Sequence, residues 1–575
     1  MTANPKQLWA ASIILSLFLI SCGNKTLAPV EQKSISRIEQ MPDIPSPLSI
    51  IDWRSKALQF DSLVFNLQAT VPMGPFIWID TNKRNFPQNT FGLYTAIGDI
   101  RQGPQHNGGE FHEALCSLSS LVSAGLVGID KTNQKGYNYV KMAQNYFNRE
   151  NGWNIVMNNT HPEVASLGGG YGRDWWYDIY PNILFYATAQ LFPGVKGNSE
   201  ILLSIANQFY KADSILAGNY DYSFFDYGQM KPGRNHIPWQ QDAAGGHAWV
   251  LYSAYQLFKD QRFLNGARQA LDALNKQPTS RFYEVLLPFG AYIAARFNAE
   301  QNTSFDVGKM LNFIFDGCQD TSGRFGWGVI AERWGDYDVY GLQGSITDGG
   351  GYAFLMNSIV LAWPLVPLVK YEPAYAKAIA KYMLNAVNAS RLFYPDQIDE
   401  KHQWLPEKKD LTNGIIGYEG LRKYDDYGKP SLKGVSPVAL GDGPKWAKGQ
   451  PEESMFSIYS SSVAGVYGAI VNKTNVEGIL KLDCNATDFY AENPFPVFML
   501  YNPYPSSHKV SYSAQSNAKL YDMLMHQFIT QQAIKDTMIE MKAGEVLLIA
   551  ELPPDAKISV KDSRIMCDGK VVAWK

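Results

Sequence analysis

Residues 248–276 read AWVLYSAYQLFKDQRFLNGARQALDALNK, and this stretch decides the fold class. In its first half the apolar side chains are three or four positions apart, at Ala248, Leu251, Tyr252, Tyr255 and Phe258. That spacing places them on one face of an α-helix. After Lys259-Asp260 a second face follows, at Phe263, Ala267, Ala270, Leu271 and Leu274. We therefore expect two antiparallel helices joined by a tight turn.

Stretches with the same period occur on both sides of this hairpin. They cover residues 110–125, 134–149, 175–192, 198–214, 282–297, 304–316, 350–363, 371–388 and 453–470. About ten to twelve helices in successive hairpins are typical of an α/α toroid, in which an outer ring of helices wraps an inner ring. An irregular helical superhelix is the alternative, and the uneven period excludes a 34-residue repeat array.

The composition changes after about residue 475. Short apolar or alternating segments at 495–501, 509–513, 545–550 and 557–560 are separated by prolines and other turn residues, as is typical of β-strands. We predict a mainly α protein, with an α/α toroid over residues 48–472 and a small antiparallel β-sandwich over residues 473–575. The polar segment 390–450 is expected to form a lid or rim loop over the toroid mouth.

The first residues predict export. Lys6 precedes an apolar run from Leu8 to Ile20 that is too short for a permanent membrane span. Ser21-Cys22 follows directly and resembles the cleavage box of bacterial lipoproteins, in which the cysteine is acylated. We expect a signal peptide over 1–21, a lipid on Cys22 and a flexible tether over 22–47, with the protein anchored at the outer membrane or elsewhere in the cell envelope. An ordinary secretory signal with an incidental cysteine is the alternative.

Composition narrows the function classes. The net charge of -3 argues against a nucleic-acid binder. The cysteines after Cys22 are far apart and lack the short paired spacings of a metal site. No phosphate-binding glycine motif, zincin helix or nucleophile elbow occurs in the sequence, so we predict neither a metal nor a cofactor. Aromatic residues make up 13% of the chain, and aromatic faces stack on sugar rings, although most of them must be core.

Two segments resemble known carbohydrate-active families. Residues 245–249 read Gly-Gly-His-Ala-Trp and, with the hairpin that follows, look like the helical hairpin of toroid enzymes such as unsaturated glucuronyl hydrolases, which commonly carry Arg-Gly-Gln-Ala-Trp there. This chain has Gly245 for the arginine and His247 for the glutamine. Residues 174–181 read Asp-Trp-Trp-Tyr-Asp-Ile-Tyr-Pro and resemble the Asn-Trp-Trp-x-x-Glu-Ile-Gly segment of helical polysaccharide lyases such as chondroitin and alginate lyases.

The second segment also departs from its family, because Asp174 replaces the asparagine and Asp178 is the acid nearest to the glutamate position. The resemblances imply an α/α toroid, and a toroid followed by a β domain is the domain order of those lyases. With a lipid anchor and aromatic loops, they also imply the glycan-degradation machinery of Bacteroidota.

Glycine-rich loops carry the candidate site, because loops at one end of the inner helices of a toroid converge on a central cleft. Two loops combine the chemistry best, 168–178 and 234–242, and the second runs into His247. We predict catalytic roles for Tyr171, Asp174, His236 and His247. We predict substrate contacts for Arg173, Trp175, Trp176, Asn235, Gln241, Arg333, Tyr337 and Asp348.

Three further groups of residues are weaker candidates for the site. Loop 105–113 contains Glu110 and Glu113, which could equally serve the first turn of a helix. Loop 332–340 leads on to Asp348, and its carboxylates could equally solubilise the loop or cap helices. The last group is Glu452, Glu453 and Tyr459.

Three functions remain open. β-Elimination on a uronic acid needs groups that neutralise the sugar carboxylate, such as Arg173, Asn235 and Gln241, and a proton-transfer set, such as His236, His247 and Tyr171. This reaction, by a polysaccharide lyase or an oligosaccharide dehydratase, is the function we favour slightly. A glucuronidase-like glycoside hydrolase is the alternative, with two carboxylates about 6.5–9.5 Å apart for inversion, drawn from Asp174, Asp178, Asp242, Asp336 and Asp348.

The third function is a non-catalytic surface glycan binder. In every case the expected partners are an oligo- or polysaccharide and, through the lipid, a membrane.

Overall fold

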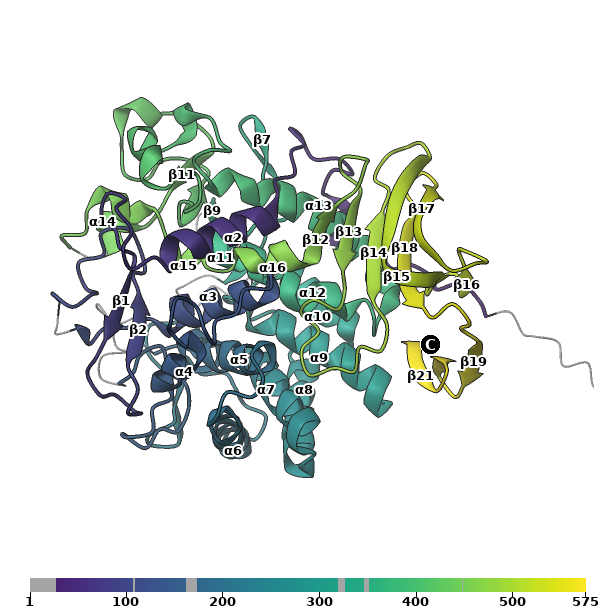
Figure 1. Cartoon of the computed structure of the whole chain (residues 1–575), viewed down its shortest axis with the longest axis horizontal. Coiled ribbons are helices and arrows are strands. Elements are labelled where there is room, and N and C mark those ends of the chain that lie inside the picture. Colours follow the sequence, from purple (N-terminus) through teal and green to yellow (C-terminus); the bar gives the residue numbers. More distant parts are fainter. Residues whose placement is uncertain are drawn as a thin grey trace, which may run out of the picture.

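The structure is a computed structural model that describes residues 27–106, 109–161, 173–318, 326–345, 351–446 and 448–574. Within these residues, one set of helices forms an inner ring (Figure 1). The ring consists of α3 (Ala114–Leu126), α5 (Trp175–Leu191), α7 (Ala243–Phe258), α9 (Leu286–Gln301), α11 (Leu355–Val360) with α12 (Ala362–Leu368), and α15 (Ile458–Ser461) with α16 (Ala464–Ile470). Each unit packs against the next, and α16 packs against α3, so the ring closes.

Outer helices alternate with the inner ones along the chain and pack on them. They are α2 (Trp53–Val64), α4 (Tyr139–Ala143), α6 (Asn198–Leu216), α8 (Gln261–Lys276), α10 (Val307–Asp316) and α13 (Ala376–Ser390). Inner helices such as α3 are apolar nearly all round, whereas α8 buries one stripe and exposes the opposite face. The difference arises because inner helices are buried on all sides, whereas α8 is buried on one side only. The predicted hairpin of residues 248–276 is the α7–α8 pair.

Short sheets interrupt the helices, so the fold is mixed α and β, and the prediction of a mainly α protein is too narrow. A five-stranded antiparallel sheet has the order β11 (Val438–Leu440), β10 (Gly420–Arg422), β9 (Tyr352–Phe354), β8 (Gln343–Ser345) and β5 (Trp327–Val329). Three hairpins complete the insertions: β1 (Ile77–Asp80) with β2 (Thr90–Leu93), β3 (Phe224–Asp226) with β4 (Lys231–Gly233), and β6 (Arg333–Trp334) with β7 (Tyr337–Asp338).

The segment 390–450, predicted as a lid or rim loop, contains two of these strands. One short helical turn (Pro430–Leu432) lies between β10 and β11, others precede β10, and α14 (Gly443–Trp446) follows β11. Three-residue strands carry too little alternation to be recognised in the sequence. The segment is therefore folded into strands and short helical turns rather than a simple loop.

The C-terminal part is an antiparallel β region at one end of the molecule (Figure 1). Its main sheet has the order β12 (Val471–Lys473), β13 (Leu480–Asp483), β14 (Val497–Tyr501), β18 (Val546–Leu552), β15 (His508–Asp522) and β16 (Gln527–Phe528), and β17 (Ile534–Met541) also pairs with β15. A separate sheet joins β19 (Ile558–Lys561), β20 (Arg564–Cys567) and β21 (Lys570–Trp574).

Side-chain alternation along β14 divides the apolar core. Val497 and Met499 belong to the large core that the helices share, whereas Phe498 and Leu500 belong to a second core within the β region. Successive side chains of a strand point to opposite faces. One face of the main sheet therefore packs on the helical ring, beside α13.

The described residues of the predicted tether do not behave as a tether. Ile35, Ile38 and Met41 are buried, and the short helix α1 (Ser36–Glu39) packs against α10 and α13. Residues 27–47 are thus part of the folded body, because their apolar side chains find a surface that composition alone does not indicate. Cys22 lies outside the described residues, and among those that are described no helix is long and apolar enough to cross a membrane.

Candidate active site

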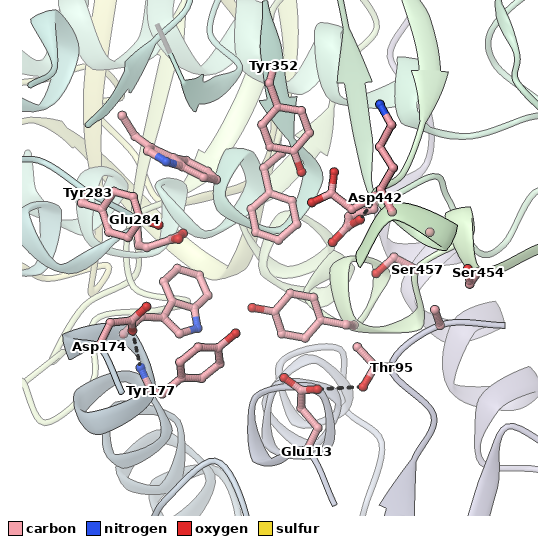
Figure 2. Close-up of a pocket in the computed structure, with 18 residues that line it drawn as sticks. Thr95, Glu113, Asp174, Tyr177, Tyr283, Glu284, Tyr352, Asp442, Ser454 and Ser457 are labelled. Atoms are coloured by element: carbon pink, nitrogen blue, oxygen red, sulfur yellow. Dashed lines mark hydrogen bonds between the residues drawn. The ribbon is translucent and has the colours of Figure 1, made fainter. Parts of the chain in front are cut away.

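A cavity of about 330 Å³ lies at the amino-terminal ends of the inner helices (Figure 2). Glu113 is the N-cap residue of α3, Asp174 that of α5, and Ser457 that of α15, while Glu284 lies two residues before α9. The ring brings these helix ends together, although the residues come from distant parts of the chain. Helix amino termini carry partial positive charge, which favours nearby carboxylates.

The cavity lining is acidic and aromatic. Its carboxylates are Glu113, Asp174, Glu284, Glu419 and Asp442, and its aromatic side chains are Trp176, Tyr177, Tyr283, Trp327, Tyr352, Phe354 and Tyr459. Lys445 is the one cationic residue among the described residues of the lining, and its Nζ lies 3.2 Å from Asp426 Oδ2. No histidine or arginine is among these lining residues.

Glu419 is a carboxyl group of this lining with a strongly raised pKa. Its backbone is fixed on both sides, because its N–H donates to the Met455 carbonyl (3.0 Å) and its carbonyl accepts from the Leu355 N–H (3.1 Å). The Asp442 N–H donates to Glu419 Oε2 at 2.8 Å. Removal from water raises the pKa of Glu419 to about 8, and the charge of Asp442 adds to this effect. Glu419 therefore carries a proton at neutral pH.

Glu284 has a different environment. Its φ of 61° lies in the left-handed region, which a residue with a side chain adopts only at a cost in energy. Such strain tends to occur at functional sites. The Asn357 side chain donates to Glu284 Oε2 at 2.6 Å, and the glutamate is only half-buried. Figure 2 shows Glu284 and Asp442 on opposite sides of the cavity.

Glu113 is held by two side chains. Thr95 Oγ1 donates to Glu113 Oε2 at 2.7 Å, and Asn158 Nδ2 donates to Glu113 Oε1 at 3.2 Å. Burial raises the pKa of Glu113. Asp174 accepts from the Tyr177 N–H at 3.2 Å, so that it caps α5 as well as lining the cavity (Figure 2).

The cavity also presents neutral polar groups. Burial raises the pKa values of Tyr177, Tyr352 and Tyr459 well above the usual value, so these phenols stay protonated at neutral pH. The Trp176 side chain is 2% exposed, and its indole Nε1 has no hydrogen-bond partner among the described residues. A buried N–H without a partner is rare in proteins, so this one is available to a ligand.

Of the residues predicted as catalytic or substrate-binding, the structure places Asp174 and Trp176 in the cavity, and Glu113 and Tyr459 from the weaker groups line it as well. Tyr171 and Asp348 lie outside the described residues. The other predicted residues do not line this cavity. His247 is fully buried in the helical core, where its Nε2 lies 3.3 Å from the Tyr227 hydroxyl and burial lowers its pKa to about 3. This buried environment gives His247 a structural role.

The remaining residues of the loops around 173 and 235 make local contacts. Arg173 pairs with Asp226 (2.9 Å), and Asn235 donates to the Arg173 carbonyl (2.8 Å). Trp175 donates from Nε1 to the Tyr222 carbonyl, Gln241 bonds to the backbone of Tyr220 and Gly218, and His236 is exposed. These contacts stabilise the loops beside the cavity.

Loop 332–340 lies elsewhere. Arg333 bonds to Asp338 and to the carbonyls of Gly335 and Asp336 within the β6–β7 hairpin, and Tyr337 packs edge-on against His402. Asp178 and Asp242, two candidates for the hydrolytic carboxylate pair, are buried and accept backbone N–H bonds from Phe225 and Tyr283. Asp336 is exposed on the hairpin.

Sequence reasoning missed Glu284, Glu419 and Asp442. Tyr283-Glu284 before an apolar helical stretch was the available signal for the first, since it repeats the acid-then-helix pattern of Glu113 and Asp174. Glu419 and Asp442 lie in the segment 390–450, where no periodic pattern indicates which side chains turn inward.

No protein-family model matches the chain, and no curated protein sequence matches it. The chain aligns with a GH127 β-L-arabinofuranosidase from Geobacillus stearothermophilus T6 at a TM-score of 0.38 and 10% identity, over 91% of this chain and 85% of that one. A structure described as a glycoside hydrolase aligns at 0.35 and 10% identity, over 80% and 76%. A GH127 β-arabinofuranosidase aligns at 0.34 and 10% identity, over 92% and 84%. All three are described as glycoside hydrolases or arabinofuranosidases, and none is described as a lyase.

Proposed function

We propose that this chain is a glycoside hydrolase in which Glu419 is the general acid and Glu284 is the opposing carboxylate. The observation that carries the proposal is that one cavity holds a glutamate that is protonated at neutral pH and a second glutamate with different neighbours. Both side chains are half-buried, but desolvation and the charge of Asp442 raise the pKa of Glu419 to about 8, whereas Glu284 accepts a hydrogen bond from Asn357. Glycoside hydrolysis uses a protonated carboxyl group as the acid and a second carboxyl group as the base or nucleophile.

The chemistry would proceed in familiar steps. Glu419 donates its proton to the glycosidic oxygen, and the bond to the anomeric carbon breaks. Glu284 either attacks that carbon or removes a proton from a water that attacks it, depending on the distance between the two carboxyl groups. The other acidic groups of the lining, such as Glu113 and Asp174, would stabilise the positive charge that develops on the sugar ring.

Uronic-acid elimination, which we expected from the sequence, has less support in this cavity. A uronate carboxylate would face five acidic side chains, and the one lining cation among the described residues is already beside Asp426. The lining tyrosines are held in the protonated form, which makes them poor bases. We therefore place the hydrolase, first kept as the alternative, ahead of the lyase.

The lining favours a sugar without a carboxylate. Aromatic faces can stack on a sugar ring, and carboxylates and tyrosine hydroxyls can accept or donate hydrogen bonds to its hydroxyl groups. Trp176 Nε1 adds a donor that has no protein partner among the described residues. We propose a neutral glycan as the substrate class.

The test is hydrolysis of a panel of neutral aryl glycosides and oligosaccharides by wild type, Glu419→Gln and Glu284→Gln. Each variant should lose roughly 10²–10⁴-fold in kcat. Substrates with a good leaving group should restore much of the activity of Glu419→Gln, because they need no proton, but not that of Glu284→Gln. Asp336→Asn, an exposed carboxylate outside the cavity, is the matched control and should keep wild-type activity.

Two results would reject the proposal. Formation of an unsaturated sugar with a new ultraviolet absorption from uronic-acid oligosaccharides would support elimination instead. Tight glycan binding without turnover of any substrate would support the third function, a non-catalytic glycan binder.

We further propose that the protein is lipid-anchored through Cys22 in the cell envelope. The support is the apolar run from Leu8 to Ile20 followed by Ser21-Cys22. Cys22→Ala should move the protein from the membrane fraction to the soluble fraction and abolish labelling with a radioactive fatty acid. An unchanged membrane fraction would contradict the anchor.

A further inference from the structure

Arg422 is the last residue of β10 and comes three positions after Glu419, the proposed general acid. Its Nη2 is 2.9 Å from Asp442 Oδ1, and its Nε is 3.4 Å from Asp426 Oδ2. Its guanidinium group stands over the Tyr352 ring, 4.5 Å from the centroid. A planar guanidinium held by carboxylates and an aromatic face has little freedom to move. Arg422 is thus a fixed anchor for Asp442.

Asp442 lies in the short link between β11 and α14, directly before Gly443. The Tyr427 hydroxyl donates to the carbonyls of Gly441 and Asp442, and these bonds fix the backbone of the link. The Asp442 N–H points at Glu419 Oε2, at 2.8 Å. Asp442 therefore touches the acid through its backbone and Arg422 through its side chain.

We propose that Arg422 and Asp442 form a positioning pair that orients the Glu419 carboxyl group and keeps its proton in place for transfer. The backbone N–H of Asp442 binds one carboxyl oxygen, which leaves the other to carry the proton. The side-chain charge of Asp442 disfavours a second negative charge on Glu419. Arg422 has the opposite electrostatic effect and fixes Asp442. The inference rests on the proposed function of Glu419.

The electrostatic balance at Glu419 has several contributors. The titratable and charged groups around it are Glu113 before α3, Tyr352 on β9, Arg422 on β10, Tyr427 between β10 and β11, Asp442 after β11, and Tyr459 on α15. Burial has the largest effect on its pKa, Asp442 is the largest charged contributor, and Arg422 opposes it. The pair can therefore be tested by removing each charge separately.

Asp442→Asn keeps the backbone N–H but removes the negative charge. The upper pH limit of kcat/KM should fall by about one unit, because Glu419 then loses its proton more readily. Arg422→Gln removes the cation, so the same limit should rise, and kcat should fall about tenfold as Asp442 loses its anchor. Arg422→Lys keeps the charge and should restore the wild-type limit with only part of kcat.

Shifts of opposite sign are the signature of the pair, since a purely structural role would lower activity in both variants without moving the pH limit. Thermal unfolding verifies that each variant is folded. Unchanged pH limits in folded Asp442→Asn and Arg422→Gln would overturn the inference.

A direct titration separates this inference from the proposed function. The protein is labelled with glutamate carrying ¹³C in the side-chain carboxyl, and Glu419→Gln identifies the Glu419 signal. Opposite shifts of its titration midpoint in Asp442→Asn and Arg422→Gln support the pair even if no glycoside is hydrolysed, in which case the hydrolase proposal alone fails. A midpoint that neither substitution moves rejects the pair even in an active enzyme.

Discussion

At the scale of single residues, withdrawal from water decides what each titratable group can do. Burial lowers the pKa of His247 to about 3 and raises that of Glu419 to about 8, and in both cases the neutral form is favoured. The consequences differ with position. A neutral histidine in an aromatic core is a packing residue, whereas a neutral carboxyl group beside a cavity is a proton donor.

The pKa of Glu419 predicts the pH above which kcat/KM falls. The proposed acid must be protonated, and its pKa is about 8. For wild type, kcat/KM should therefore fall about tenfold per pH unit above about pH 8. The measurement is kcat/KM on one unactivated glycoside from pH 5 to 10. A decline that begins near pH 5 would exclude Glu419 as the general acid.

His247 predicts acid sensitivity of the fold. Its pKa in the folded state, about 3, is below the usual value of 6.5, so the unfolded chain binds a proton that the folded chain does not between these pH values. The free energy of unfolding therefore falls as the pH decreases from about 6.5 to about 3. His247→Gln removes this titration and should show a smaller loss of Tm between pH 7 and pH 5 than wild type, despite a lower Tm at pH 7.

The difference in Tm between the two pH values is compared within each protein, so the lower Tm of His247→Gln at pH 7 does not enter the result. An equal loss of Tm in His247→Gln and wild type would show that His247 does not contribute to acid sensitivity.

At the scale of elements, close contact between inner helices explains one departure from the family that the sequence resembles. Gly245 on α7 stands where toroid enzymes commonly carry arginine. A Cβ at Gly245 would lie 2.4 Å from the Leu286 carbonyl oxygen and 3.1 Å from Gly290 Cα on α9. The two glycines let the backbones of α7 and α9 touch, and a long side chain at 245 has no room.

Gly245→Ala should consequently lower the free energy of unfolding by about 1–3 kcal/mol, the usual cost of overpacking a core. The atoms that the new methyl group meets are backbone atoms, which cannot move aside. Gly266→Ala on the outer helix α8 is the matched control, because its nearest contact is the end of the Leu251 side chain, at 2.9 Å. Chemical unfolding of both variants tests this, and equal stabilities would refute the close-contact explanation.

The elements differ in how far the sequence predicts them. The apolar period locates the long helices well: the expected helix at 175–192 is α5 (Trp175–Leu191), and that at 198–214 is α6 (Asn198–Leu216). The three-residue strands β5 and β8–β11 have no comparable period: β10 and β11 lie in the segment expected as a loop, and β9 lies at the start of the helix expected over 350–363. The expectation that loops before the inner helices converge on a cleft places Asp174 and Trp176 in the cavity. Glu419 precedes β10 and Asp442 follows β11, and no pattern in the sequence indicated either residue.

At the scale of the whole molecule, a buried polar network joins the helical ring to the β region. Asp488, between β13 and β14, accepts hydrogen bonds from the Tyr371 hydroxyl (2.9 Å) and from Lys370 Nζ (2.6 Å) just after α12. Arg296 on α9 donates to the carbonyls of Phe489 and Tyr490. This network lies on the opposite side of the ring helices from the cavity, since it contacts the later parts of α9 and α12. It therefore couples the two regions without taking part in the site.

Removing one charge of this network should be costly, because the other stays buried. Lys370→Met leaves Asp488 without its cation and should lower the free energy of unfolding by about 3–5 kcal/mol. Lys370→Met/Asp488→Asn removes both charges and should recover a large part of that loss. Lys377→Met, an exposed lysine on α13, is the control and should stay within about 0.5 kcal/mol of wild type.

Calorimetry tests whether the ring and the β region unfold together. One transition in wild type that divides into two in Lys370→Met indicates that the two regions are coupled through Asp488. Two transitions already present in wild type would show that the ring and the β region unfold independently.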